Sequence, residues 1–395
     1  MSAPQKLLKT FQFLENNEDL KGLFRYNLMS LNIEFTRKAI GGAGGWQNNK
    51  NLHDHDLLQI KYMLSVLTSN EYTKNIIEEA IILVSKKKSY HPLKDYLTSL
   101  KWDGVNRLDT WIIDYLGVED NSYSRDVGRK ILCGAVKRAF CPGCKFDYML
   151  ILEGEQGIGK STLIENLTGQ WYIDTDLSVS ENRKDLVDTL SSGWIVEVGD
   201  LAGFNKSDVE MLRAFLTRKV DKVRLSYDKR VLDFPKQCIL IGTHNPSGSN
   251  EYLKDDTGNR RFWPVECTKA DYKEIISVRD QLFAEAVSKY ENEVLFLDNP
   301  KSLEILQELH DSRTSSNPLK ETIDEFVKTR DKVTANEIIR EGLKLDTSKL
   351  DGRNIRGKQT LIGIWMRKNK WLKKGDTYIK PDDYKIVKEE IVWDN

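Results

Sequence analysis

The residues best suited to chemistry lie together in one short segment, 154–161, which reads GEQGIGKS. Its three glycines allow backbone N–H groups to close around an anion, because glycine adopts conformations that other residues avoid. In such a loop, Lys160 reaches the β- and γ-phosphates of a nucleotide and the Ser161 hydroxyl is a ligand of Mg²⁺. An apolar strand pattern at 148–152 precedes the loop and a helical pattern at 161–167 follows it, as a phosphate-binding loop requires.

This pattern predicts a binding site for ATP and Mg²⁺. The expected nucleotide-binding residues are Gly154, Gly157, Ile158, Gly159, Lys160, Ser161 and Thr162.

A second strand pattern, WIVEVGD at 194–200, supplies the acidic residues that a nucleotide hydrolase needs. Glu197 lies within the strand or at its tip, and Asp200 follows three residues later. One of the two should hold Mg²⁺ through water, and one should orient the attacking water. The sequence does not assign these two roles, so both residues remain catalytic candidates. Ser161 and Glu197 form the expected metal site.

Polar residues also end a third strand pattern, at 237–242. Asn245, which follows Thr243 and His244, can hydrogen-bond the γ-phosphate or the attacking water when it lies at the tip of such a strand. A plain Asn-Pro turn is an equally weighted alternative. His244 is expected to be structural.

Two arginines, Arg260 and Arg261, follow a glycine turn and precede an aromatic strand pattern. A guanidinium at such a place can contact a phosphate, which in ring-shaped ATPases belongs to the neighbouring subunit. A surface ion pair is the alternative. The sequence does not choose between the two arginines.

The elements that must position these residues form an α/β pattern. Between about residues 120 and 300, apolar strand patterns alternate with helical patterns, which is typical of a parallel sheet. Helical patterns precede this stretch, and a linker at 315–318 separates short helical patterns and a hairpin pattern from it. We therefore predict three parts. They are a helical N-terminal region at 1–118, a P-loop core with a parallel sheet at 119–314, and a winged-helix-like module at 315–395.

Bulk properties exclude several classes of protein. The formal net charge is +0, so the chain as a whole is not an electrostatic binder of nucleic acid. The longest apolar runs have the length of a strand, far below the ~20 residues of a membrane span. Residues 1–18 are polar and have no apolar signal core, so we expect a cytoplasmic protein with no membrane partner. Five cysteines are too few for a disulfide scaffold.

Basic residues concentrate near the C-terminus. Residues 332–380 contain thirteen Lys and Arg against five Asp and Glu, which suits a surface that contacts phosphates. A helix-turn-helix-like fold could place this charge on DNA, whereas a solvated basic face is the alternative. The expected DNA-binding residues in this module are Arg356, Lys358, Lys373 and Lys374.

Taken in order, these motifs resemble those of the virulence-associated protein E family of phages and pathogenicity islands. The resemblance is carried by the phosphate loop, WIVEVGD at 194–200, IGTHN at 241–245 and LKDDTGNRRFWP at 253–264. HPLKDYL at 91–97 and KWDGVNRL at 101–108 resemble the lead-in of that family. The likeness covers about residues 20–310. Because the family resembles superfamily 3 helicases, it implies an AAA+ fold for the core.

The resemblance also implies partners and further site residues. It implies a replicative helicase of a bacterial host cell that assembles on single- and double-stranded DNA as a ring, usually a hexamer, and works with a primase or other replication proteins. It gives Asn245 a sensor role and makes Arg260 or Arg261 the finger that crosses the subunit interface. It implies a channel hairpin at 220–231, in which Lys229 and Arg230 contact DNA and Tyr227 either stacks on a base or packs within the protein. A solvated hairpin without DNA contact is the alternative.

The sequence thus predicts an ATP-dependent DNA helicase that takes part in the replication of a phage or mobile element. Three alternatives remain open: a DNA-dependent ATPase that acts as a switch or loader without unwinding, a small-molecule kinase, and a non-replicative interference or virulence factor.

Overall fold

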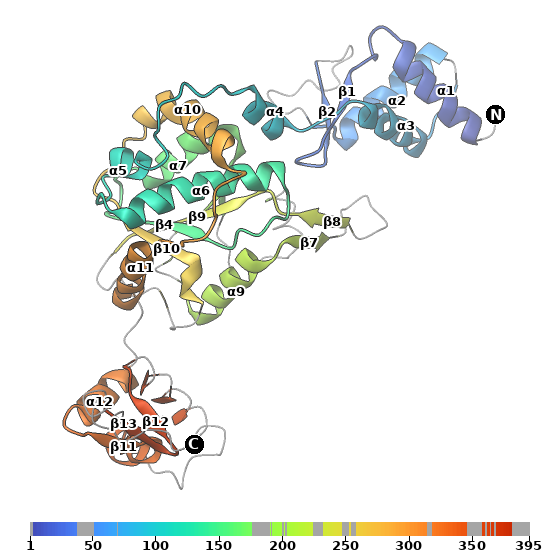
Figure 1. Cartoon of the computed structure of the whole chain (residues 1–395). Helices are drawn as coiled ribbons and strands as arrows, with labels where there is room; N and C mark the ends of the chain where they lie inside the picture. The colour runs from blue at the N-terminus through green and yellow to red at the C-terminus, as the bar shows by residue number, and fades with distance from the viewer. Residues whose placement is uncertain are drawn as a thin grey trace, which may run out of the picture. The chain divides into compact units, whose positions relative to one another are not determined.

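The computed structural model divides the chain into two compact units, 1–313 and 314–395 (Figure 1). It describes residues 3–37, 51–68, 70–175, 190, 192–199, 201, 204–223, 232–246, 253, 258–313, 318–345, 358–359, 362–363, 365–366 and 369–380. None of the helices in these ranges is long and apolar enough to cross a membrane.

A five-stranded sheet in which every pair of neighbours is parallel forms the centre of the first unit. Its strands, in spatial order, are β10 (Phe262–Glu266), β4 (Met149–Glu153), β9 (Ile239–His244), β6 (Ile195–Val198) and β5 (Tyr172–Thr175). The parallel α/β core predicted from the sequence is therefore present. Because all five strands run in one direction, their carboxyl ends lie at the same edge of the sheet.

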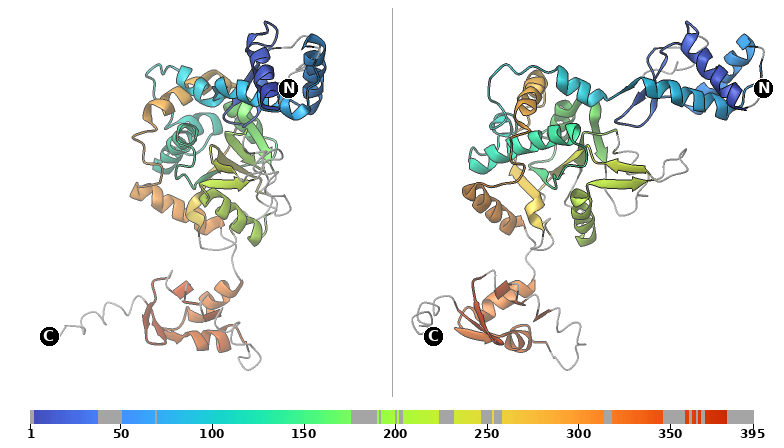
Figure 2. Two further views of the ribbon diagram at one scale, coloured as in Figure 1. Left: turned by 90° about the vertical axis from the view of Figure 1, so that its right-hand side faces the viewer. Right: turned by 45° about the vertical axis from the view of Figure 1, so that its right-hand side comes forward.

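Helices cover both faces of this sheet, as Figures 1 and 2 show. They are α6 (Ser122–Phe140), α7 (Lys160–Thr168) and α10 (Glu274–Lys289) on one face, and α9 (Lys206–Thr217) on the other. Successive side chains of a strand point to opposite faces. Leu150 and Leu152 of β4 accordingly pack in the core with α6, α7 and α10, whereas Met149 and Ile151 pack with α9. This two-sided burial explains why the strands read as continuous apolar runs.

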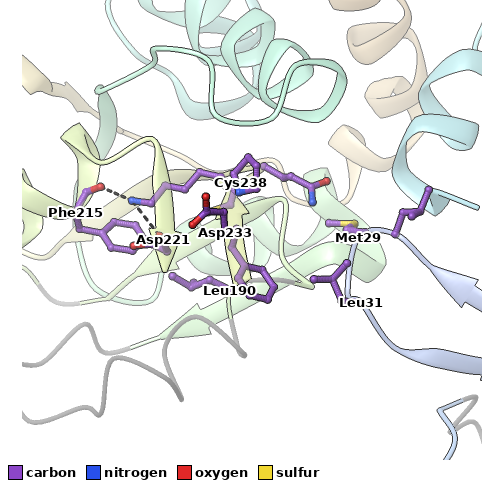
Figure 3. A pocket seen from close by; sticks show the side chains of 12 residues that line it. Met29, Leu31, Leu190, Phe215, Asp221, Asp233 and Cys238 are labelled. Carbon is purple, nitrogen blue, oxygen red and sulfur yellow. Dashed lines mark hydrogen bonds and ion pairs between the residues drawn. The ribbon is translucent and has the colours of Figure 1, made fainter. Parts of the chain in front are cut away.

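Two further elements lie between α9 and β9. β7 (Val220–Val223) and β8 (Leu232–Pro235) pair antiparallel as a ribbon. β7 lies in the segment 220–231 predicted as the channel hairpin, and β8 directly follows that segment. The predicted DNA-gripping residues of that hairpin lie outside the described residues. The ribbon borders a cavity of about 140 Å³, whose opposite wall includes Met29 and Leu31 (Figure 3).

The N-terminal part combines helices with a small sheet that the sequence analysis did not predict. Its helices are α1 (Ala3–Asn16), α2 (Asp54–Thr68), α3 (Lys74–Lys87), α4 (Pro92–Ser99) and α5 (Trp111–Leu116), and its strands are β1 (Phe24–Asn27), β2 (Ile33–Phe35) and β3 (Ser89–Tyr90). The strands, in the order β2-β1-β3, are two to four residues long. Such short strands leave almost no period-two signal in a sequence.

The second unit has its own core, built around Ile323, Val333, Ile338 and Tyr378. Its elements are α12 (Pro318–Val327), β11 (Lys332–Thr334), α13 (Ala335–Glu337), the π-helical turn η4 (Ile338–Gly342), β12 (Leu372–Lys374) and β13 (Thr377–Ile379). β12 and β13 form the hairpin predicted around residues 373–376, and β11 pairs with β13. Residues 360–369 are described only in part. The winged-helix assignment and the three-part division at 118 and 314 remain predictions.

A buried ion pair joins the end of β4 to the last residue of the first unit. Nε and Nη2 of Arg313, at the end of α11 (Pro300–Arg313), donate to the two carboxylate oxygens of Glu153. The two side chains are almost fully buried, so each neutralises a charge that would otherwise be costly to desolvate. Glu153 immediately precedes the phosphate loop, and the pair therefore fixes the strand end that carries this loop.

We predict that Arg313→Met destabilises the first unit by about 3–5 kcal/mol, because it leaves the Glu153 carboxylate buried without a cation. The measurement is urea unfolding of the full chain, followed by tryptophan fluorescence. The control is the double variant Glu153→Leu/Arg313→Met, which should recover most of the loss because neither charge remains. Equal losses in the single and double variants would contradict the assignment.

Candidate functional site

The phosphate loop has the geometry that its glycines predict. It connects β4 to the N-terminus of α7, with Gly157 and Gly159 at φ angles of 84° and 98°. Residues with a Cβ rarely adopt these angles. A Cβ on Gly159 would lie 2.7 Å from the ring of Tyr272, and a Cβ on Gly154 would lie 2.5 Å from the carbonyl oxygen of Cys267. The loop therefore requires glycine both for its turn and for close packing.

Lys160 projects back across this loop. Its Nζ donates to the carbonyl oxygens of Gly154 and Glu155, each at 2.8 Å, and to Oδ1 of Asn245 at 2.9 Å. Asn245 directly follows β9, so the structure brings the predicted sensor residue into contact with the loop lysine. Burial lowers the pKa of the Lys160 ammonium below its ordinary value, and the charge of nearby Glu197 opposes this effect.

Glu197 accepts hydrogen bonds from three hydroxyl groups at the centre of the site. Its side chain is 2% exposed and lies on β6, next to β9 in the sheet. Ser161 donates to Oε1 at 2.6 Å, Thr243 donates to the same oxygen at 2.9 Å, and Tyr172 donates to Oε2 at 2.6 Å. The predicted metal pair of Ser161 and Glu197 is therefore in direct contact. These bonds hold both carboxylate oxygens in one orientation.

Sequence reasoning missed Tyr172 and Thr243 as members of this site. Tyr172 pairs with Ile195 across β5 and β6, and Glu197 lies two residues further along, on the same face. Thr243 lies two residues beyond Ile241, which pairs with Glu197. Both relations depend on which strands are neighbours, and this order cannot be read from one sequence. A local signal existed for Thr243 alone, because this residue belongs to the same polar strand end as Asn245.

The arginine pair lies at the opposite edge of the sheet. Arg260 and Arg261 form the turn η3 (Asn259–Arg261), just before the amino end of β10. The parallel register pairs Phe262 with Met149 and Glu266 with Glu153, so four residue steps, or about 13 Å of strand, separate this end from the phosphate loop. The structure does not bring the pair to the Lys160 site of the same copy.

The two arginines differ in their surroundings. Arg261 is partly buried, its Nε lies 3.6 Å from a carboxylate oxygen of Asp147, and its Nη1 contacts the carbonyl oxygen of Gly258 at 3.4 Å. Arg260 is exposed and makes no hydrogen bond or ion pair within the described residues. Of the two candidates for a finger, Arg260 is therefore the one whose guanidinium is available to a partner.

The family model of the virulence-associated protein E-like domain matches residues 97–315, which is more than half of the chain. This chain belongs to the virulence-associated protein E-like family. No curated protein matches it.

Solved structures show weaker likenesses to this family member. The apo structure of the NrS-1 C-terminal region has a TM-score of 0.48 at 12% identity, and the match covers 90% of this chain and 86% of that one. The X-ray structure of JCV helicase has a TM-score of 0.30 at 14% identity, and covers 83% of this chain and 93% of that one. At such scores neither likeness carries weight for the site, which stands on its own geometry.

Several predicted residues of this virulence-associated protein E-like chain lie outside the described ranges. They are Asp200, Tyr227, Lys229, Arg230 and Arg356. Ile158, in the phosphate loop, is partly exposed. Thr162, in the first turn of α7, is exposed. Lys373 and Lys374 are exposed on β12, and Lys358 is partly exposed.

The donor atoms of the site suit a triphosphate with Mg²⁺. Mg²⁺ prefers oxygen ligands and is usually bound by one or two protein groups together with phosphates. The Ser161 hydroxyl and the Glu197 carboxylate provide such oxygens at the N-terminus of a helix, where backbone N–H groups favour anions. Elsewhere in the described part of the chain, no group of three or more His, Cys, Asp or Glu could hold a metal ion.

We predict that Tyr172→Phe raises the Mg²⁺ concentration for half-maximal ATP binding by about tenfold, because partners of a metal ligand tune metal affinity. Fluorescent ATP titrated at several Mg²⁺ concentrations measures this shift. The matched control is Tyr290→Phe, because among the described residues the Tyr290 hydroxyl bonds only its exposed neighbour Glu291. If Mg²⁺ dependence is the same in both variants, Tyr172 does not tune the site.

Proposed function

We propose that this protein is an ATP-dependent DNA helicase that serves replication of a phage or mobile element, and that it hydrolyses ATP in a ring of identical subunits. One observation carries the proposal. The phosphate loop, Glu197 and Asn245 meet at one edge of the sheet, whereas the arginine pair lies at the other. A complete site then needs two copies in head-to-tail contact, and such contacts form a ring when the rotation between successive copies closes.

In the proposed site, each residue of this chain has a separate task. Lys160 neutralises charge on the β- and γ-phosphates, and Ser161 and Glu197 hold Mg²⁺. When bound, Mg²⁺ offsets the charge that develops on the transferred phosphoryl group. Asn245 reports on the γ-phosphate through its contact with Lys160. Asp200 is proposed to orient the attacking water, since Glu197 is assigned to Mg²⁺ together with Ser161.

Arg260 is proposed as the finger that reaches the nucleotide of the neighbouring copy. Its exposed guanidinium at the amino edge of the sheet supports this choice over Arg261, which faces Asp147. A hexamer, a primase partner and hairpin contacts by Tyr227, Lys229 and Arg230 remain part of the proposal through family membership.

The first prediction from this function concerns DNA-stimulated hydrolysis. ATPase activity should rise with single-stranded DNA, and Lys160→Ala should lower it by about 100-fold or more, because a preorganised charge at the reacting phosphates is lost. Phosphate release, measured with and without DNA, checks both effects. Lys301→Ala, an exposed lysine at the start of α11, is the control.

Two results of this experiment would argue against the proposal. Hydrolysis that is indifferent to DNA would favour a small-molecule kinase. DNA-stimulated hydrolysis in a ring that cannot displace an annealed strand would favour a switch or loader.

A second prediction concerns the proposed DNA-binding face of the C-terminal unit. Lys373 and Lys374 are exposed on the hairpin, and the Lys373 amine lies 5.8 Å from the centre of the Tyr378 ring. Lys373→Ala/Lys374→Ala should weaken duplex binding equally for all sequences and reduce the slope of log K against log salt by about one to two. Fluorescence anisotropy in a salt series measures this slope. An unchanged slope, or the same loss in the exposed control Lys328→Ala, would count against the assignment.

A further inference from the structure

The turn that carries the two arginines is held by a buried residue of α9. Arg213 is 9% exposed, and its Nη2 donates to Oδ1 of Asn259 at 2.7 Å. Asn259, itself 6% exposed, is the first residue of η3 and directly precedes the arginine pair. A charged donor bonded to a buried amide oxygen is a strong and directional contact. It fixes the start of the turn relative to α9.

Close packing reinforces this hydrogen bond. Gly258 precedes the turn at a φ of 78°, and a Cβ at this position would lie 3.3 Å from Cδ of Arg213 and 3.2 Å from Nη1 of Arg261. The Arg213 guanidinium also lies 5.8 Å from the centre of the Phe262 ring, at the start of β10. Arg213 therefore contacts residues on both sides of the arginine pair.

α9 is a rigid platform for this side chain. Asn205 caps its N-terminus and accepts hydrogen bonds from the backbone N–H groups of Ser207 and Asp208. Its apolar face is buried against the sheet. Near its other end, the amine of Lys236 donates to the carbonyl oxygen of Phe215 and lies 3.9 Å from Asp221. Burial lowers the pKa of Lys236 to about 8.

Figure 3 shows Phe215 and Asp221 close together at this anchored end. Asp221 lies on β7 and also accepts a hydrogen bond from Arg218 at 2.8 Å. α9 is thus fixed at both ends and along one face.

The same residues face an open groove with a volume of about 480 Å³, lined by Arg213, Ala214, Thr217, Arg218 and Arg261. The three arginines that line it are already held within the chain, Arg213 by Asn259, Arg218 by Asp221 and Arg261 beside Asp147. The groove borders the turn that carries Arg260, at the sheet edge remote from the phosphate loop of the same copy.

We propose that Arg213 is a positioning residue that holds the finger turn, so that Arg260 meets the γ-phosphate of the nucleotide bound to a neighbouring copy. The inference rests on the proposed function and adds to it a residue that acts on the neighbour's site without touching the nucleotide. Reactions are sensitive to such positioning, since a displacement of about 1 Å can reduce a rate by about 100-fold.

The test is subunit mixing. Arg213→Met should reduce the ATPase kcat of the full-length protein by about 10- to 100-fold, while the affinity of the variant for fluorescent ATP stays within about twofold, because its own phosphate loop is intact. Mixing it with Lys160→Ala before assembly should restore activity. About one quarter of the interfaces in a random 1:1 mixture combine an intact loop with an intact finger turn.

Two control mixtures give this result its meaning. Arg213→Met with Arg260→Ala should not recover, because both lesions lie on the finger side. Lys160→Ala with Glu197→Gln should not recover either, because both lie on the loop side. Arg260→Ala with Lys160→Ala should recover as a reference.

The outcomes separate the inference from the function on which it rests. If the reference mixture recovers and the Arg213→Met mixture does not, Arg213 has only a structural role and the inference is overturned. Unchanged activity in Arg213→Met overturns it as well. If the reference mixture itself fails, the shared site is wrong, and the proposed function falls together with the inference.

A second pair of variants guards against misfolding of Arg213→Met. Asn259→Leu removes the accepting oxygen from the other side of the contact and should reproduce the loss of kcat and its recovery on mixing. Asn259→Asp keeps an accepting oxygen for the guanidinium and should retain at least about half of the activity. Equal activity in these two variants would contradict a role for the Arg213–Asn259 bond.

Discussion

The common direction of the five central strands is the constraint on which the rest of the site depends. Parallel pairing places the ends of β4, β6 and β9 at one edge of the sheet. Each strand end delivers one polar group, and these groups then need no long loops to meet. Ser161 reaches Glu197 at 2.6 Å and Lys160 reaches Asn245 at 2.9 Å because the sheet has already brought their segments together. The sheet itself is stabilised by two apolar cores, one packed against each face.

The same constraint has an opposite consequence at the other edge. Whatever precedes a strand lies a full strand length away from whatever follows its neighbour. Arg260 and Arg261 precede β10, whereas the phosphate loop follows β4, so one copy cannot use both on one nucleotide. A head-to-tail assembly resolves this separation, because the amino edge of one copy then faces the carboxyl edge of the next. In that arrangement, cooperation between copies is a result of strand direction.

Three buried charged groups at this site are stabilised by an ion pair or by hydrogen bonds. Glu153 is neutralised by Arg313, whereas Lys160 donates hydrogen bonds to loop carbonyl oxygens and Glu197 accepts them from three hydroxyl groups. Each group would otherwise be costly to remove from water. These contacts also restrict the side chains to single orientations, which a site for phosphate chemistry requires. Stability and preorganisation therefore come from the same bonds.

The sequence by itself determined the phosphate loop, the acidic strand and the alternation of strands and helices, because these signals are local. A glycine loop between an apolar strand and a helix is contained in about twenty consecutive residues. Membership of the virulence-associated protein E-like family was also recognisable, since the order of motifs survives without any coordinates. Only the tertiary structure decided that Tyr172 and Thr243 bind Glu197, that Arg313 neutralises Glu153, and that Arg213 holds the turn of Arg260. Arg313 and Glu153 are 160 residues apart in sequence, and Arg213 and its hydrogen-bond partner Asn259 are 46 apart. Whether such residues meet depends on strand order and register. Single-sequence patterns record which face a residue prefers, but they do not record which neighbour lies across from it.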